Sequence, residues 1–117
     1  MFNKVFEDKF NGSFIKGYEL SQKCDILNVI KIFQDSNVMI NNVYVNENAD
    51  LGLKTFQGNY SLDEFLIKYN LIKKDIESVI LSLDNNNRLY INNENYISLS
   101  SDNDIELNDL LDKSKRL

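Results

Sequence analysis

The chain lacks histidine, proline and tryptophan, and it has a single cysteine, Cys24. Without histidine it cannot form a Ser-His-Asp or Cys-His catalytic set, or a zinc site that uses imidazole ligands. One cysteine cannot form an intramolecular disulfide, which is typical of a reducing compartment. The 4 glycines form no phosphate-binding loop. We therefore expect no enzymatic activity, no metal and no cofactor.

Long apolar runs are also absent. No stretch approaches the roughly 20 apolar residues of a membrane span, and the first ten residues mix charges with phenylalanine instead of forming an apolar signal core. Hydrophobic residues make up 43% of the 117 residues, which is ordinary for a packed interior. These features predict a cytoplasmic protein without a membrane contact, built as one domain or as two very small modules that share a core.

The charge balance is acidic. The formal net charge is −5 and the isoelectric point is near 4.6. Nonspecific binding of nucleic acid depends on a basic surface, so this balance argues against it. An acidic protein can still carry a local basic face, and the composition alone does not decide between nucleic acid and protein as the partner.

The first half of the sequence suggests helices followed by a β-rich stretch. Phe2, Phe6 and Phe10 recur every four residues and predict a short amphipathic helix. The following Asn11-Gly12 dipeptide is compatible with a helix C-cap or with a hairpin turn. Residues 21–35 have a wide apolar face at helical spacing, and residues 38–45 are β-rich. A polar connector is expected over residues 46–58.

The second half has a sharper pattern. Ser61 and Glu64 form a capping box, which predicts that a helix begins there. A tight turn at Asn70-Leu71 would lead into a second helix over residues 73–86, with Asn87 as its C-cap. Two strands, a polar turn between them and a tail helix are expected next. The strands span residues 88–92 and 96–100, and the tail helix follows a second capping box, Ser101 with Asp104.

An internal repeat also links the two halves. Residues 23–39 (KCDILNVIKIFQDSNVM) align with residues 73–89 (KKDIESVILSLDNNNRL) without a gap. Identical residues occupy Lys23/Lys73, Asp25/Asp75, Ile26/Ile76, Val29/Val79, Ile30/Ile80 and Asn37/Asn87. Any two amphipathic helices share an apolar stripe, so the match is compatible with a duplicated module or with chance.

The run LIKKDIESVILSL (residues 71–83) and the NRLYI that follows (residues 87–91) resemble the winged helix-turn-helix superfamily. The resemblance covers residues 60–99 and implies an α+β fold, with a helical part at residues 1–50, a winged helix at 51–100 and a tail at 101–117. One interpretation is a tandem pair of winged-helix modules. The other is a single module whose first helix is residues 21–35, with residues 38–58 as an insertion.

The resemblance implies a non-catalytic regulator of transcription or replication that binds DNA. The helix over residues 73–86 would then read the major groove, and the turn between the two strands would contact the backbone. The expected DNA contacts are Lys73, Lys74, Ser78, Arg88 and Asn93.

A protein-binding winged helix is the alternative, acting as an acidic adaptor or as an inhibitor of a nucleic-acid enzyme. Residues 59–100 contain more acidic than basic side chains, which would repel DNA. Ile72 and Leu81 would be apolar groups on the exposed face, and exposed apolar patches tend to mark protein interfaces. With Glu94 they form the expected protein contact. Leu81 packed into the core is the other possibility.

Two further features have open interpretations. Tyr44, Tyr90 and Tyr96 lie on expected strands, where they would stack on nucleic-acid bases or pack in the core. The tail helix would either form a homodimer or pack against its own domain.

Overall fold

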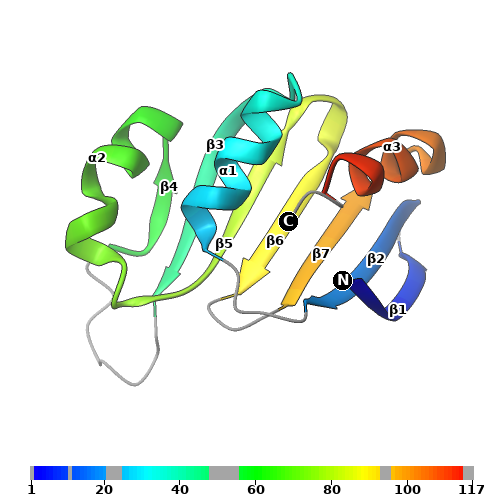
Figure 1. The fold of residues 1–117 in the computed structure, drawn as a ribbon, viewed down its shortest axis with the longest axis horizontal. Helices are drawn as coiled ribbons and strands as arrows, with labels where there is room; N and C mark the ends of the chain where they lie inside the picture. Colours follow the sequence, from blue (N-terminus) through cyan, green and yellow to red (C-terminus); the bar gives the residue numbers. More distant parts are fainter. Residues whose placement is uncertain (1, 11, 21–24, 48–55, 93–95, 115–117) are drawn as a thin grey trace.

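An antiparallel sheet with all of its helices on one face forms the fold (Figure 1). The computed structural model describes residues 2–10, 12–20, 25–47, 56–92 and 96–114. Within these ranges the sheet has seven strands, in the order β1-β2-β7-β6-β5-β3-β4. The strands are β1 (Phe2–Phe10), β2 (Ser13–Leu20), β3 (Ile40–Glu47), β4 (Gly58–Tyr60), β5 (Ile76–Leu83), β6 (Arg88–Asn92) and β7 (Tyr96–Ser101).

In the described part of the chain, three α-helices connect or follow the strands. They are α1 (Ile26–Asp35), α2 (Leu62–Ile72) and α3 (Asp104–Ser114). A short 3-10 turn, η2 (Asp84–Asn86), joins β5 to β6. Figure 1 shows α2 over the β4 end of the sheet, α1 beside it, and α3 over β7. The crossover from β2 through α1 to β3 spans β7, β6 and β5, so the first hairpin and the β3–β4 pair lie at opposite ends of the sheet.

The strands have one apolar and one polar face because side chains alternate along a strand. Directly paired residues share a face, and one such row runs from Val43 through Leu81 and Leu89 to Leu99. All four side chains are fully buried. The helices complete this core with Ile26, Val29, Ile30 and Phe33 of α1, Phe65 and Ile72 of α2, and Leu107 of α3.

Two helices begin at side-chain caps that the sequence contains, whereas two other predictions about helix ends are wrong. Asn103, and not Ser101 with Asp104, caps α3, and the predicted turn at Asn70-Leu71 lies within α2. The Ser61 hydroxyl accepts a hydrogen bond from the Glu64 amide at 3.2 Å and donates to the Glu64 carboxylate at 3.2 Å, which confirms Ser61 as the cap that starts α2. The Asp25 carboxylate accepts from the Leu27 amide at 3.0 Å and starts α1. The tail helix predicted after residue 101 and the strands predicted over residues 88–92 and 96–100 are also present.

The winged-helix prediction is wrong. Residues 76–83 form strand β5 in the middle of the sheet, where the predicted recognition helix over residues 73–86 would have been. Val79, Leu81 and Leu83 are spaced two residues apart, and this period places them in one apolar face between β3 and β6, with Ile80 and Ser82 on the opposite face. The protein therefore has one large sheet with helices on one side, where the prediction had a helical domain with a two-stranded wing.

The tandem interpretation and the first predicted helix are wrong as well. The two aligned segments have different structures, α1 in one case and β5 in the other. Residues 2–10 form strand β1, which pairs with β2 as a hairpin whose last pair is Phe10 with Ser13. Gly12 has a φ of +85°, which suits a hairpin turn, so the hairpin interpretation of Asn11-Gly12 is the correct one.

Candidate functional site

The sheet face that no helix covers carries a band of tyrosines. Tyr44 on β3, Ile80 on β5 and Tyr90 on β6 pair directly across the sheet, and Ser98 of β7 and Gly17 of β2 extend the row. We call this surface the tyrosine face. It consists of Asn42, Tyr44, Asn46, Ser78, Ile80, Ser82, Arg88, Tyr90, Asn92, Tyr96, Ser98 and Ser100. Most of these side chains are half-buried, as expected for an open sheet face.

Neighbouring side chains hold the tyrosine face in a defined arrangement. The rings of Tyr90 and Tyr96 meet edge to face with their centroids 6.0 Å apart. Burial raises the pKa of the Tyr96 phenol, with the neighbouring Tyr90 adding to the shift. The amide of Asn46 donates to the Ser78 hydroxyl at 3.0 Å. Aromatic rings ordered in this way lose little side-chain entropy when a partner binds.

Charge is confined to the border of this surface, where Arg88 lies on β6 and the exposed Glu19 of β2 pairs with Tyr96. Arg88 is the one charged side chain among the paired outward positions of β3, β5, β6 and β7 within the described residues. It is exposed and lies near the η2 end of the sheet. The face therefore offers aromatic, hydroxyl and amide groups, together with one cation and one anion at its border.

Two cavities flank the asparagine-rich connection between β5 and β6. Asn85 and Asn86 have φ angles of +62° and +60°, in the left-handed region that asparagine tolerates better than most residues. One cavity of about 270 Å³ adjoins the tyrosine face and is lined by Ser13, Asn86, Arg88, Ser100 and Asp102. The other, of about 200 Å³, is lined by Asn37, Val38, Met39, Leu83, Asp84, Asn85, Asn87, Glu106 and Asp109. The second cavity is acidic, because Asp84, Glu106 and Asp109 line it and no Lys or Arg is among its lining residues.

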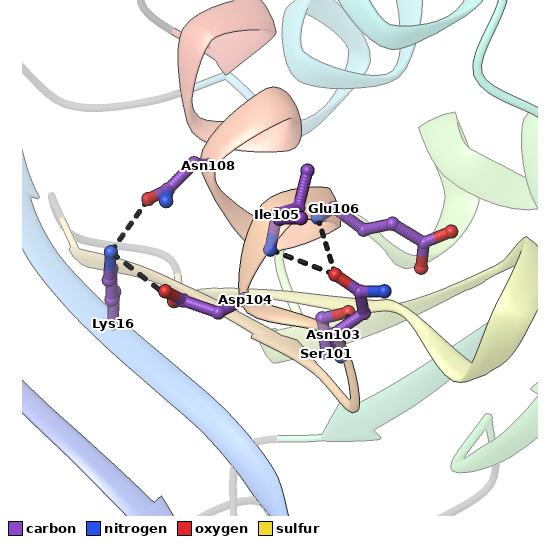
Figure 2. A network of polar contacts seen from close by, with 7 residues as sticks. All are labelled: Lys16, Ser101, Asn103, Asp104, Ile105, Glu106 and Asn108. Atoms are coloured by element: carbon purple, nitrogen blue, oxygen red, sulfur yellow. Dashed lines mark hydrogen bonds and ion pairs between the residues drawn. The ribbon is translucent and has the colours of Figure 1, made fainter.

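A polar network fixes the start of α3 beside the first hairpin (Figure 2). The Asn103 side-chain oxygen accepts from the amides of Ile105 at 2.9 Å and Glu106 at 3.2 Å. Lys16 of β2 donates to Asn108 at 2.8 Å and lies 3.9 Å from Asp104. These contacts have a structural explanation, because they cap α3 and join it to β2. The network is therefore not part of the candidate site.

The three residues predicted to lie on the DNA-reading helix, Lys73, Lys74 and Ser78, do not share a helix. Lys73 and Lys74 are exposed just after the end of α2. Ser78 and Arg88 lie on the tyrosine face, where Ser78 is only 4% exposed and bonded to Asn46, while Arg88 is exposed. Asn93 lies outside the described residues. The strand structure of residues 76–83 removes the common helical surface that the prediction needed.

The predicted protein-binding patch has a different location as well. Leu81 is fully buried and Ile72 is 1% exposed, and both belong to the core. The alternative prediction for Leu81, packing in the core, is the correct one. Glu94 lies outside the described residues. A helical spacing would have exposed Leu81, whereas its strand position turns it toward the helices.

Sequence reasoning identified part of the tyrosine face. Tyr44, Tyr90 and Tyr96 were singled out on expected strands, and all three lie on the uncovered face. The central strand was missed because residues 73–86 read as a helix, which hid Ile80 and Ser82. The available signal is the β-branched, apolar run at Val79-Ile80-Leu81 with a serine on each side, which suits a strand as well as a helix.

No protein-family model, no curated protein and no solved structure matches this chain. Among the described residues, no helix is long and apolar enough to cross a membrane. No set of three or more Cys, Asp or Glu side chains in the described ranges is arranged to hold a metal ion.

Proposed function

We propose that this protein is a non-catalytic binding domain that holds a protein partner on the tyrosine face. The observation that carries the proposal is the composition of that face, which is tyrosine, serine, asparagine and one isoleucine, with one arginine and one glutamate at its border. Tyrosine supplies large contact area at a low entropy cost, and serine and asparagine supply adaptable hydrogen bonds. Protein interfaces are enriched in tyrosine and arginine and depleted in lysine, glutamate and aspartate at their centres.

Electrostatics favour a protein over nucleic acid as the partner. Tyrosines on an open sheet are able to stack on bases, but affinity for single strands also needs cations along the backbone path. Arg88 is the single cation on the paired outward positions described above, and the whole chain carries a net charge of −5. A partner with a neutral surface rich in aromatic and amide groups complements this face without unpaired charges.

The test removes two rings from the centre of the face. We expect the double substitution Tyr44→Ser with Tyr90→Ser to weaken partner binding by more than tenfold, since buried tyrosines at an interface each contribute about 2 kcal/mol or more when they are hot spots. The partner is first captured on the immobilised wild-type protein, then purified and titrated by calorimetry. Ile105→Ser is the matched control, because it truncates an exposed apolar side chain on α3, away from the tyrosine face.

Two results would count against the proposal. One is equal affinity of the captured partner for wild type and the double variant, with the control unchanged. The other is binding of a fluorescent single-stranded or duplex oligonucleotide that falls steeply with salt and is lost in the double variant. That second result would assign the face to nucleic acid. We expect no anisotropy change with either oligonucleotide, even at low salt.

A further inference from the structure

Helix α2 exposes an apolar stripe on the side that faces away from the sheet. Ile67 is 80% exposed and Leu71 is 78% exposed, and Leu66 beside them is 40% exposed. Ile67 and Leu71 are one helical turn apart and therefore lie on the same side of the helix. The opposite side is accounted for, because Phe65 and Ile72 are in the core. Exposed large apolar residues that line up in this way mark a contact surface.

The charges at the two ends of this stripe are opposite in sign. Asp63 lies one helical turn before Ile67, and Lys74 lies just beyond the C-terminal end of α2, and both are exposed. Glu64 and Lys73 reinforce the acidic and the basic end. Lys68, in the middle of the helix, is directed toward β4, where its ammonium group lies 5.2 Å from the centre of the Tyr60 ring. The stripe is therefore an apolar centre between an acidic and a basic end.

We infer that α2 pairs antiparallel with α2 of a second copy of this chain. In that arrangement Ile67 of one copy meets Leu71 of the other, and the acidic end around Asp63 meets the basic end around Lys74. A two-fold axis produces each of these contacts twice, as self-complementary interfaces require. A parallel pair would bring the two acidic ends together, and also the two basic ends.

The inference goes beyond the proposed function and does not depend on it. Helix α2 packs on the helix-covered face of the sheet, so the pair leaves the tyrosine faces of both copies uncovered (Figure 1). A helix of 11 residues offers less contact area than a standard protein interface. The pair is therefore a reversible dimer whose population rises with concentration.

Sedimentation velocity over a series of protein concentrations tests the inference. We expect the wild type to shift from monomer to dimer as the concentration rises, and Leu71→Asp to remain a monomer at every concentration. Circular dichroism checks that Leu71→Asp is folded, which we expect because Leu71 is exposed. Ile105→Asp on α3 is the matched control and keeps the wild-type profile, since Ile105 is equally exposed but outside the stripe.

A charge exchange separates an antiparallel pair from other modes. Asp63→Lys alone and Lys74→Asp alone each weaken dimerisation by about tenfold, because two symmetry-related attractions become repulsions. The double variant Asp63→Lys with Lys74→Asp restores the wild-type dimerisation constant. A monomeric wild type at all concentrations, an unaffected Leu71→Asp dimer, or a double variant as weak as the single ones would each overturn the inference. Loss of the dimer in Ile105→Asp instead would move the interface to α3.

Discussion

Two similar stretches of this chain adopt different secondary structures. Residues 25–37 form α1 and its caps, whereas residues 75–87 form β5 and the turn after it. Both begin with Asp-Ile, and both have Val-Ile three residues later and Asn at the end. The shared apolar residues satisfy a helical and an extended pattern alike, so they do not select the structure.

The residues that differ make the selection. Lys31 is exposed on α1, and its counterpart Leu81 is buried between β3 and β6. With Leu81 apolar, Val79, Leu81 and Leu83 form an alternating run that fits one face of a sheet. With Lys31 polar, burial in the first stretch is limited to the helical positions Ile26, Val29, Ile30 and Phe33. The exchange of Lys31 for Leu81 is therefore one difference that favours a strand in the second stretch.

The stretches also end differently. Asn37 has a φ of +62°, and the amides of Asn37 and Val38 donate to the carbonyls of Gln34 and Phe33 at 3.0 and 2.9 Å. This is the hydrogen-bond pattern of a Schellman cap. Asn87 is extended, and the left-handed residues lie before it at Asn85 and Asn86. The two equivalent asparagines therefore have different roles. Asn37 caps the end of a helix, and Asn87 is the extended residue just before strand β6.

Exchanging the deciding residue gives the largest expected effect. Leu81→Lys places an unpaired charge in the core, and we expect it to cost more than about 4 kcal/mol of unfolding free energy. The reciprocal Lys31→Leu changes an exposed position and should stay within about 0.5 kcal/mol. Urea denaturation followed by circular dichroism measures both. If Leu81→Lys is as stable as the wild type, Leu81 is not a core residue and β5 is wrongly assigned.

Should Leu81→Lys fail to fold, Leu81→Ala supplies the measurement. Removal of a buried leucine side chain costs about 2 to 5 kcal/mol and leaves most core residues in place.

Replacing the aspartate at the start of each stretch, Asp25 or Asp75, is expected to have an intermediate effect on the free energy of unfolding. Asp25→Ala removes the side chain that caps the start of α1, and the loss of such a cap costs about 1 kcal/mol. Asp75→Ala precedes a strand, where no helix cap is required, and is expected to change stability by less than about 0.5 kcal/mol. The same denaturation series compares the two variants. Equal losses at both positions would contradict the different roles assigned to the two stretches.

The smallest expected effect is on the pH dependence of stability, and it involves Tyr69 of α2. Burial raises the pKa of the Tyr69 phenol, and the Asp25 carboxylate and its hydrogen bond add to the shift. Below the unfolded pKa of about 10 both states are protonated. Above it the unfolded state loses its proton first, so stability falls as the pH rises toward the folded pKa.

We therefore expect Tyr69→Phe to lose less stability than the wild type between about pH 9 and about pH 11. Urea midpoints across this range measure the difference. Asp25→Ala should also flatten the profile, because it removes one cause of the shift. Parallel profiles for wild type and Tyr69→Phe would show that Tyr69 does not contribute.

Local signals were sufficient for part of the fold. The capping box at Ser61, the helical face that ends at Asp35 and the two strands that begin at Arg88 and Tyr96 were all predicted from neighbouring residues. Spacings of four residues were misleading, because four is close to one helical turn and is also twice the strand period. Phe2, Phe6 and Phe10 predicted a helix for this reason, although their segment is strand β1.

The candidate site was less predictable than the fold. Tyr44, Tyr90 and Tyr96 were identified as stacking candidates, but their common face depends on the sheet order, which places β5 between β3 and β6. Pairing between segments far apart in the sequence leaves no local signal. Burial of Ile72 and Leu81 is decided by the same tertiary contacts, so the predicted apolar patch could not be excluded from the sequence.

The pairing of β2 with β7 has a consequence for how the chain folds. Residues of the first hairpin bond to the last strand and to α3 across 89 to 92 positions of sequence, as in the contacts Ser13–Asp102 and Lys16–Asn108. During synthesis the hairpin has no inner neighbour until β7 has left the ribosome. Proteins dominated by such distant contacts fold in milliseconds to seconds, more slowly than those with local contacts. We therefore expect docking of the hairpin to be a late step of folding.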